Sequence, residues 1–203
     1  MTPLARFETG KNDAMIKTTK ENHLTMRNRI EIVPYDNSLA LPTAQAMLEV
    51  FSAPPFNEAL TLNDTLSLLE SDQARGGFSG VLVRLADEVV GFSWWYDITG
   101  RELYDRWWSR FTPRENIPTL DGRGAYMMEF GVLPTLQHRG LGQRLLKASL
   151  EQIEPKHDWI ALDTSRFAHA GLALLKSQAF EELDLTGVQS PQRVCLMKRI
   201  WRS

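Results

Sequence analysis

The sequence predicts a single α+β domain, and two observations support this prediction. The 203 residues are 43% hydrophobic and 24% charged, which is the composition of a globular domain large enough to bury a sizeable core. Between residues 30 and 200, segments in which apolar and polar residues alternate are interspersed with segments in which apolar residues recur every three or four positions. No internal repeat appears, so we expect one domain in which strands and helices succeed one another.

The first half of this domain contains a strand at 29–35, helices at 41–51 and from 63 onward, and strands at 80–85 and 89–96. The first strand alternates apolar and polar residues, and the first helix places apolar side chains on one face until Pro54 and Pro55 stop it. Asn63 and Asp64 are expected to cap the second helix. The two following strands form a hairpin around residues 86–88, a common antiparallel connection.

A long connection precedes the second half of the domain. Residues 98–124 are polar, are broken by Pro113 and Pro118, and are expected to form a loop between the third and fourth strands. The elements after this loop are a strand at 126–133, a helix at 141–153, a strand at 159–163, a helix at 170–177 and a strand near 194–200.

Residues 1–29 differ from the rest of the chain. They mix basic residues with Asn and Thr and show no sustained period, so we expect an N-terminal extension to a domain at 30–203. They lack the hydrophobic core of a secretory signal, and Glu8, Asp13 and Glu21 argue against a transit peptide.

Charge and cysteine content argue against several function classes. The net charge of −2 and the pI near 6.1 argue against bulk nucleic-acid binding. No apolar run approaches the roughly 18 residues that a membrane span needs. Cys195 is the only cysteine, so no internal disulfide is expected, which fits a reducing, cytoplasmic setting.

The most informative segment is Gln137–Gly142, which lies between an apolar strand and an amphipathic helix. Backbone N–H groups at a helix start have no intrahelical acceptor and lie at the positive end of the helix dipole. Gly140 and Gly142 carry no Cβ atom, so a bulky anion can lie directly against the backbone. The segment therefore predicts a binding site for a phosphate or pyrophosphate group.

Three phosphate-binding patterns compete for this segment. The P-loop requires Lys and a hydroxyl residue after its second glycine, whereas Gln143, Arg144 and Leu145 follow here. The dinucleotide fingerprint requires a third small residue in place of Leu145, although Asp163 lies about 20 residues further on, as that fingerprint asks. The third pattern, Gln/Arg-x-x-Gly-x-Gly/Ala, matches throughout. An ordinary glycine turn would have no use for Arg139 and two glycines at a helix start.

With Val132 and Pro134 at the strand end and Arg139 in the turn, the third pattern resembles motif A of the GNAT superfamily of acyl-CoA-dependent N-acyltransferases. The succession of predicted strands and helices over residues 30–200 is also similar to that of this family. The resemblance implies a GNAT-like fold with a mixed, mostly antiparallel central sheet of about six to seven strands, splayed in the middle and flanked by four or more helices. The long loop would be an insertion.

The resemblance implies acetyl-CoA as the cofactor and gives a role to each part of the motif. The backbone of Gly131, Val132 and Leu133 would hold the pantetheine arm like an added strand, and the Val132 N–H would stabilise the oxyanion. The pyrophosphate would be bound by the following backbone segment with help from two further residues: Gln137, His138, Arg139, Gly140, Leu141 and Gly142, then Gln143 and Arg144.

Glu129 is the candidate general base, acting directly or through a water. It lies three residues before Val132, and its apolar neighbours Met127, Met128 and Phe130 should raise its pKa toward neutrality. A structural carboxylate hydrogen-bonded within the sheet, or one that only contacts a cationic acceptor, would be placed in the same way.

The general acid is the point at which the sequence departs from the family. Leu175 stands where many family members have Tyr, so the usual phenol near the sulfur is missing. His169, Ser165 and Tyr126 are replacements by residue type only. A thiolate is already a tolerable leaving group, so the reaction does not strictly require an acid.

Aromatic residues are the candidates for the acceptor site. Phe56 and Asn57 lie in a proline-containing loop that resembles one bordering the acceptor pocket in a subset of the family. Trp95, Trp107 and Trp108 either pack in the core or line a pocket under the insertion, where aromatic faces attract a cation.

These features together lead us to expect a cytoplasmic N-acetyltransferase that moves an acetyl group from acetyl-CoA directly to a primary amine of a small molecule or peptide. No metal, nucleic acid or membrane partner is expected, and a homodimer is the default oligomeric state. The alternatives are a non-catalytic acyl-CoA sensor, suggested by the missing Tyr, and a protein-interaction module with a vestigial CoA site, suggested by the Trp-rich loop.

Overall fold

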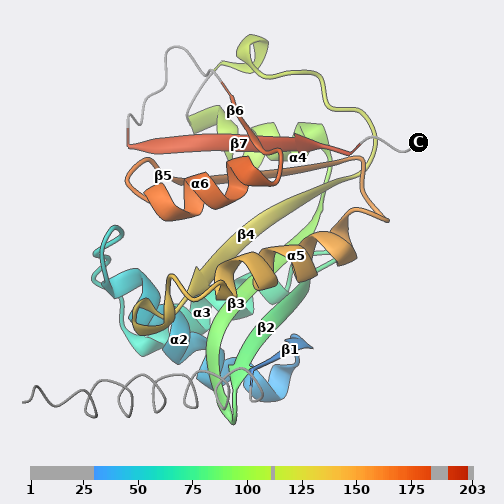
Figure 1. Cartoon of the computed structure of the whole chain (residues 1–203). Helices are drawn as coiled ribbons and strands as arrows, with labels where there is room; N and C mark the ends of the chain where they lie inside the picture. The colour runs from blue at the N-terminus through green and yellow to red at the C-terminus, as the bar shows by residue number, and fades with distance from the viewer. Residues whose placement is uncertain (1–29, 111–112, 184–191, 201–203) are drawn as a thin grey trace, which may run out of the picture.

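A seven-stranded sheet in the order β1-β2-β3-β4-β5-β7-β6 forms the centre of the molecule (Figure 1). The computed structural model describes residues 30–110, 113–183 and 192–200, so the predicted extension at 1–29 lies outside it. The strands are β1 (Ile30–Pro34), β2 (Ser79–Leu85), β3 (Glu88–Ile98), β4 (Gly124–Val132), β5 (Trp159–Ser165), β6 (Glu181–Glu182) and β7 (Arg193–Arg199). Only β4 and β5 pair in parallel, so the sheet is mixed and mostly antiparallel.

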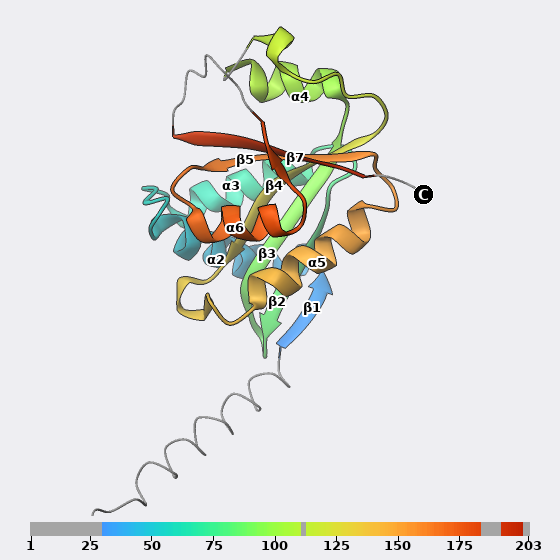
Figure 2. The same cartoon turned by 45° about the horizontal axis from the view of Figure 1, so that its top comes forward.

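Five α-helices in these described ranges cover the sheet: α2 (Ala40–Ser52), α3 (Leu62–Gln73), α4 (Gly100–Arg106), α5 (Leu141–Ile153) and α6 (His169–Ser177). Helices α5 and α6 lie on one face, and α2 and α3 lie on the other (Figure 1 and Figure 2). Each face buries its own apolar clusters, because strand side chains alternate between the two faces. The predicted α+β fold is confirmed. None of the described helices is long and apolar enough to cross a membrane.

Helix α5 shows how directly the sequence determines an element. Its buried residues recur at three- and four-residue spacing, which forms one stripe along the helix: Leu141, Leu145, Leu146, Ser149, Leu150 and Ile153. Most of this stripe packs into the cluster on one face of the sheet, together with residues of β2, β4 and β5. The helix begins and ends at the predicted residues.

The start of α3 differs from the predicted cap at Asn63 and Asp64. Thr61 is the N-cap residue: its hydroxyl oxygen accepts from the Asp64 N–H at 3.2 Å, and the Asp64 carboxylate accepts from the Thr61 N–H at 2.8 Å. Both orphan donors are thereby satisfied. Asp64 takes part in the cap, but from the third position of the helix.

Residues 98–124 contain a helix that the polar, proline-broken composition did not predict. Thr99 and Glu102 cap α4 by the same reciprocal arrangement, with N–H to side-chain oxygen distances of 3.0 and 3.2 Å. Leu103 of this helix is fully buried against the sheet. The Thr-x-x-Glu signature of a helix start is visible in the sequence, and the expectation of a plain loop was wrong for α4.

The parallel pair β4–β5 separates soon after it begins. Register pairs join only the first residues of the two strands: Gly124 with Trp159, Ala125 with Ile160, and Tyr126 with Ala161. Strand β4 then continues to Val132 and β5 to Ser165 without further pairing, while β3 and β7 remain paired on their outer sides. The predicted splay in the middle of the sheet is therefore confirmed. It leaves backbone groups of β4 open toward β5.

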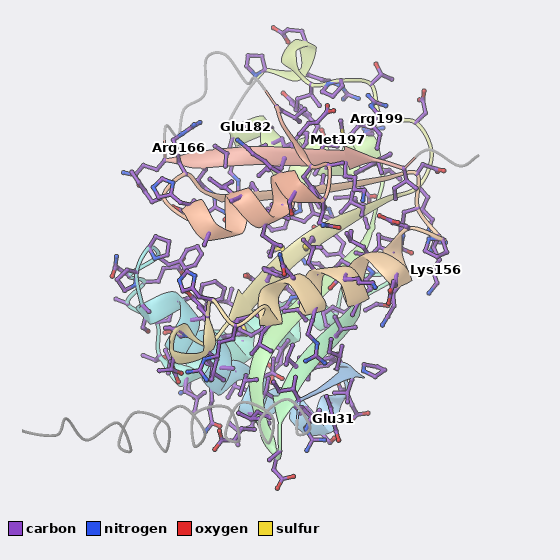
Figure 3. All side chains as sticks on the ribbon, in the orientation of Figure 1. Glu31, Lys156, Arg166, Glu182, Met197 and Arg199 are labelled. Carbon is purple, nitrogen blue, oxygen red and sulfur yellow. The ribbon has the colours of Figure 1, made fainter. Side chains whose placement is uncertain are left out.

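The short edge strand β6, which the sequence did not predict, is held to α6 by ion pairs. The Glu182 carboxylate lies 3.0 Å from Nζ of Lys176, which belongs to α6. It also lies 3.2 Å from Nη1 of Arg166, which precedes α6 (Figure 3). The hydrogen bond from Lys176 lowers the pKa of Glu182. These contacts fix α6 beside the gap between β4 and β5.

Gly124 provides a test of the pairing that precedes the separation. A Cβ atom at this position would lie 2.1 Å from the Trp159 ring, so Gly124→Ala must push β4 and β5 apart. We expect a loss of about 1–3 kcal/mol in the free energy of unfolding, measured by urea denaturation. The control is Gly171→Ala in α6, where a Cβ meets nothing within 4 Å and a gain of about 0.4–1 kcal/mol is expected. Equal stability of the two variants would contradict this account.

Candidate active site

A cavity of about 990 Å³ lies where β4 and β5 separate. Its walls come from α2, α3, the loop between them, the segment after α4, β4, β5, the start of α5, α6 and the start of β7. Its ionisable lining residues are Glu58, Arg110, Tyr126, Glu129, His138, Asp163, His169 and Arg193. Small-molecule sites typically span about 300–1,000 Å³, so the cavity is large enough for a sizeable cofactor arm and a second ligand.

One end of the cavity is formed by the start of α5. The first hydrogen bond of this helix runs from the Arg144 N–H to the Gly140 carbonyl at 3.2 Å, so the N–H groups of Leu141, Gly142 and Gln143 precede the helical ladder. Gly140 has φ +78°, in the left-handed region where glycine is at no disadvantage. The helix therefore presents a set of N–H donors and its positive dipole end, which together form an anion site.

The second glycine of the motif allows α5 and α6 to approach each other. A Cβ atom on Gly142 would lie 3.3 Å from Leu174 Cδ2 of α6. Not every predicted residue of the segment lines the cavity: Gln137, His138, Gly140, Gly142 and Gln143 do so, whereas Arg139, Leu141 and Arg144 do not. Leu141 instead buries its side chain in the core, and the two arginines are exposed.

The backbone of β4 forms the floor of the cavity. The Leu133 N–H bonds to the Val90 carbonyl of β3 at 3.0 Å. Because antiparallel partners alternate between bonded and non-bonded pairs, Gly131 also directs its N–H toward β3, whereas Phe130 and Val132 direct theirs into the gap. The Val132 carbonyl, which faces the same way, accepts from Gln137 Nε2 at 3.1 Å. Open N–H groups in the gap therefore belong to Phe130 and Val132, whereas the N–H groups of Gly131 and Leu133 face β3.

Glu129 faces the cavity from β4. A bulge at Met128 precedes it, because the register to β3 shifts between Trp94 and Trp95. Within the described ranges, no side chain forms a hydrogen bond or ion pair with the Glu129 carboxyl. Burial raises the pKa of Glu129 well above its ordinary value, and the negative charges of Asp72 and Glu58 raise it further. The carboxyl is thus suited to take up a proton or to meet a cation.

The opposite side of the gap carries a network that sequence reasoning missed. The Asp163 carboxylate of β5 accepts hydrogen bonds from the Tyr126 hydroxyl and from the Arg193 guanidinium of β7. Burial, followed by the charge of Asp163, raises the pKa of Tyr126 well above its ordinary value, so this hydroxyl keeps its proton. The polar end of an otherwise apolar strand was the available signal, but Arg193 is too distant in sequence to have been connected with it.

Two of the five predicted acceptor residues line the cavity. Trp107 stacks on Tyr126 with ring centroids 5.3 Å apart and an interplanar angle of 11°. Its indole Nε1 donates to the Tyr96 hydroxyl, and the Arg110 guanidinium lies 5.0 Å from its ring centre. Phe56 enters the cavity from the loop between α2 and α3. The insertion thus contributes an aromatic wall.

The other three predicted acceptor residues lie elsewhere. Trp95 is 3% exposed and packs with α5 in the core, because it points to the opposite face of β3 from Trp94. Trp108 is fully buried in a separate cluster, and Asn57 is exposed outside the cavity. Leu175, at the position of the expected Tyr, does line the cavity, so this wall is apolar.

Comparison with known proteins agrees with this architecture. The model of the acetyltransferase (GNAT) family matches residues 44–180. No match was found among curated proteins. Solved structures with a similar fold include the ribosomal-protein-S18-alanine N-acetyltransferase from Escherichia coli, with 13% identity, 86% of this chain and 96% of that chain covered, and a TM-score of 0.60.

Two further solved structures were determined with a coenzyme. Arabidopsis thaliana NAA60 in complex with acetyl-CoA has 16% identity, a TM-score of 0.57, and coverage of 84% of this chain and 99% of that one. The PaiA N-acetyltransferase from Thermoplasma acidophilum in complex with coenzyme A has 13% identity, a TM-score of 0.58, and coverage of 84% and 98%. At these identities the structures show the fold, and the family model covers most of the domain. The chain therefore belongs to the GNAT acetyltransferase family.

Proposed function

We propose that this protein transfers an acetyl group from acetyl-CoA directly to a primary amine. The observation that carries the proposal is the position of Glu129, whose carboxyl has no partner in the described part of the chain. It faces a cavity that also contains an anion-binding helix start and open N–H groups of β4. Membership of the GNAT family and the coenzyme complexes of similar structures support acetyl-CoA as the cosubstrate.

The residues at the coenzyme end fit a long molecule with a diphosphate at one end. The N–H groups at the start of α5 would hold the diphosphate, and each charge-assisted hydrogen bond is worth about 1.5–3 kcal/mol. The gap beside Phe130 and Val132 would hold the extended arm in the way that a sheet edge binds an added strand. When bound, acetyl-CoA supplies an activated acyl group as a thioester.

The N–H groups in the gap also provide the electrostatic stabilisation that acyl transfer needs. Attack of the amine places negative charge on the former carbonyl oxygen, and a donor fixed in the sheet stabilises that charge without reorganising. Val132 directs its N–H into the gap, and its carbonyl is held by Gln137. We propose the Val132 N–H as the oxyanion donor.

Glu129 would make the amine reactive. An alkyl amine with a pKa of about 10.4 is almost fully protonated at neutral pH and has no free lone pair. In the proposed step Glu129, directly or through a water, first takes one proton from the ammonium, which frees the nitrogen lone pair for attack. As the C–N bond forms and the C–S bond breaks, the nitrogen loses its second proton to solvent, and the thiolate takes a proton from solvent, because Leu175 provides no acid.

A covalent acyl-enzyme is not part of this proposal. Cys195 is buried on β7, does not line the cavity, and has a pKa raised by burial to about 12. Its thiol therefore remains protonated, and the thiolate is the nucleophilic form. Direct transfer between two bound substrates is the simpler route.

The proposed function is tested by the release of free thiol from acetyl-CoA in the presence of a panel of primary amines. Amine-dependent release supports an enzyme. The missing Tyr at Leu175 favours one alternative, an acyl-CoA sensor, which would be stabilised by acetyl-CoA without consuming it. With acetyl-CoA present at 100 times its Kd, the free energy of unfolding of such a sensor rises by about 2.7 kcal/mol. Stabilisation without turnover by any amine would replace the proposal with the sensor.

Gly142→Glu should weaken coenzyme binding while the domain remains folded. The new carboxylate would lie beside the N–H groups at the start of α5 and repel a diphosphate, so the Kd for CoA should rise at least about 10-fold, the worth of one charge-assisted hydrogen bond. Titration calorimetry measures this Kd. Lys147→Gln, which makes the same change in net charge on an exposed part of α5, is the control and should bind normally. Normal binding by Gly142→Glu would remove the case for this site.

Glu129→Gln should depress turnover about 10²–10⁴-fold, the usual contribution of a general base. The Kd for acetyl-CoA should not change, since the carboxyl lies beyond the anion site. Because only the carboxylate accepts a proton, the wild-type rate should rise with pH through the raised pKa of Glu129, and this rise should be absent in the variant. Steady-state rates over a pH series measure both effects. Glu31→Gln on β1, far from the gap (Figure 3), is the control.

The same substitution should stabilise the fold at neutral pH. A carboxyl whose pKa is raised by folding holds its proton more tightly in the folded state, so stability falls as the pH rises from the ordinary carboxyl pKa of about 4.3 up to the raised value. Gln cannot ionise and escapes this cost. Glu129→Gln should therefore melt at a higher temperature than wild type at neutral pH, and the difference should vanish in acid. A lower melting temperature throughout would show that Glu129 has a structural role.

A further inference from the structure

The acceptor end of the cavity has a chemical character of its own. We infer from it that the acceptor is a primary amine attached to an apolar body of about the size of an aromatic ring. The inference rests on the proposed function, because it specifies the substrate of the same site. It is carried by the juxtaposition of two carboxylates that have no partner among the described side chains and a wall of aromatic and aliphatic side chains.

The apolar wall comes from α2, α3 and the loop that joins them. Its lining residues share an uncharged, largely hydrocarbon surface: Val50, Phe51, Pro55, Phe56, Leu60 and Leu68. Phe51 and Phe56 meet edge to face with ring centroids 5.3 Å apart. Trp107 and Tyr126, which stack on each other, add a second aromatic pair to the lining. Aromatic side chains in a pocket favour a ligand that buries a ring against them.

Exposed apolar side chains are concentrated on the same cavity. Among the described residues, three large hydrophobic side chains are exposed: Leu41 at 50%, Leu68 at 42% and Phe167 at 56%. Leu68 from α3 and Phe167 from the loop before α6 both line the cavity, whereas Leu41 does not. Isolated exposed apolar residues are ordinary on protein surfaces, but two from distant elements that face one cavity indicate a surface that a ligand covers.

The charged residues that line the cavity carry a formal charge of −1, from three carboxylates and two guanidinium groups. Asp163 is neutralised by Arg193, and Arg110 donates to the Trp107 carbonyl at 2.9 Å and lies over its ring. No described side chain pairs with the carboxylates of Glu129 and Glu58. One ammonium group placed at Glu129 would bring the formal charge of the cavity to zero. Spermidine has more ammonium groups than these two carboxylates could pair with, so it would have to bury one of them without a partner, which is costly.

The test compares amines that differ only in the body attached to nitrogen. We expect kcat/KM with acetyl-CoA to be at least about 10-fold higher for phenethylamine than for ethanolamine or spermidine, the lower end of what a few methylene groups contribute in an apolar pocket. Two tripeptides, one with Phe and one with Ser at the N-terminus, show whether the preference for an apolar ring also holds for a peptide acceptor. Preference for phenethylamine alone indicates a small-molecule acceptor, and preference for the Phe peptide indicates a peptide acceptor.

A matched pair of variants locates the preference. Leu68→Gln removes an apolar side chain from the wall, and Leu41→Gln makes the same change at a similarly exposed position outside the cavity. Leu68→Gln should raise KM for the preferred amine several-fold and should narrow the preference for phenethylamine over ethanolamine, while KM for acetyl-CoA stays unchanged. Leu41→Gln should behave as wild type.

The outcomes separate this inference from the function on which it rests. Equal kcat/KM for phenethylamine and ethanolamine, or a preference for spermidine, would overturn the inference and leave the acetyltransferase in place. Absence of turnover with every amine would overturn the proposed function. In that case, the melting temperature of the CoA-bound protein is measured with each of the same amines. The inference fails if phenethylamine raises this temperature no more than ethanolamine does.

Discussion

The separation of β4 from β5 is the constraint on which the rest of this structure depends. A parallel pair inside a sheet normally satisfies its backbone groups along its whole length, but here the pairing ends at Tyr126 and Ala161. The fold tolerates the opening because β3 and β7 still pair on the outer sides, and because α5 and α6 bury the apolar cluster beneath both halves. The open N–H groups of β4 are therefore free to bind a ligand, and the start of α5 faces the same cavity.

The bulge at Met128 decides which face of the sheet carries the chemistry. Along an undistorted strand Glu129 would share the face of Met127, which packs against the cluster under α5. The extra residue shifts the alternation, so Phe130 and Val132 take that face and Glu129 joins the side of α2 and α3. On that side, burial raises the pKa of the Glu129 carboxyl, and the charges of Asp72 and Glu58 raise it further. One inserted residue thus places the carboxyl beside the acceptor wall.

Features that depend on residues close together in the sequence could be predicted, and features that depend on residues far apart in the sequence could not. The turn at Gln137–Gly142, the limits of α5 and the six longer strands along the chain depend on local spacing, and these could be predicted. The position of Trp95 could not, because it depends on which face of β3 each side chain takes once several strands pair. The ion pair of Asp163 with Arg193 joins residues that are distant in sequence. Helix α4 was not predicted, although its capping residues Thr99 and Glu102 are visible in the sequence, because the polar composition of the segment indicated a loop.

The electrostatic state of Glu129 connects stability with the proposed chemistry. An ordinary buried carboxylate would be paired, and pairing would lower its pKa and make it a poor base. Here Arg193, the cation that favours the charged form of Glu129, is engaged with Asp163, so its effect is smaller than that of burial. The protein therefore carries a destabilising group at the centre of its cavity. A substrate ammonium relieves this cost when it binds, because its positive charge favours the ionised form of Glu129, and only the ionised form can accept a proton.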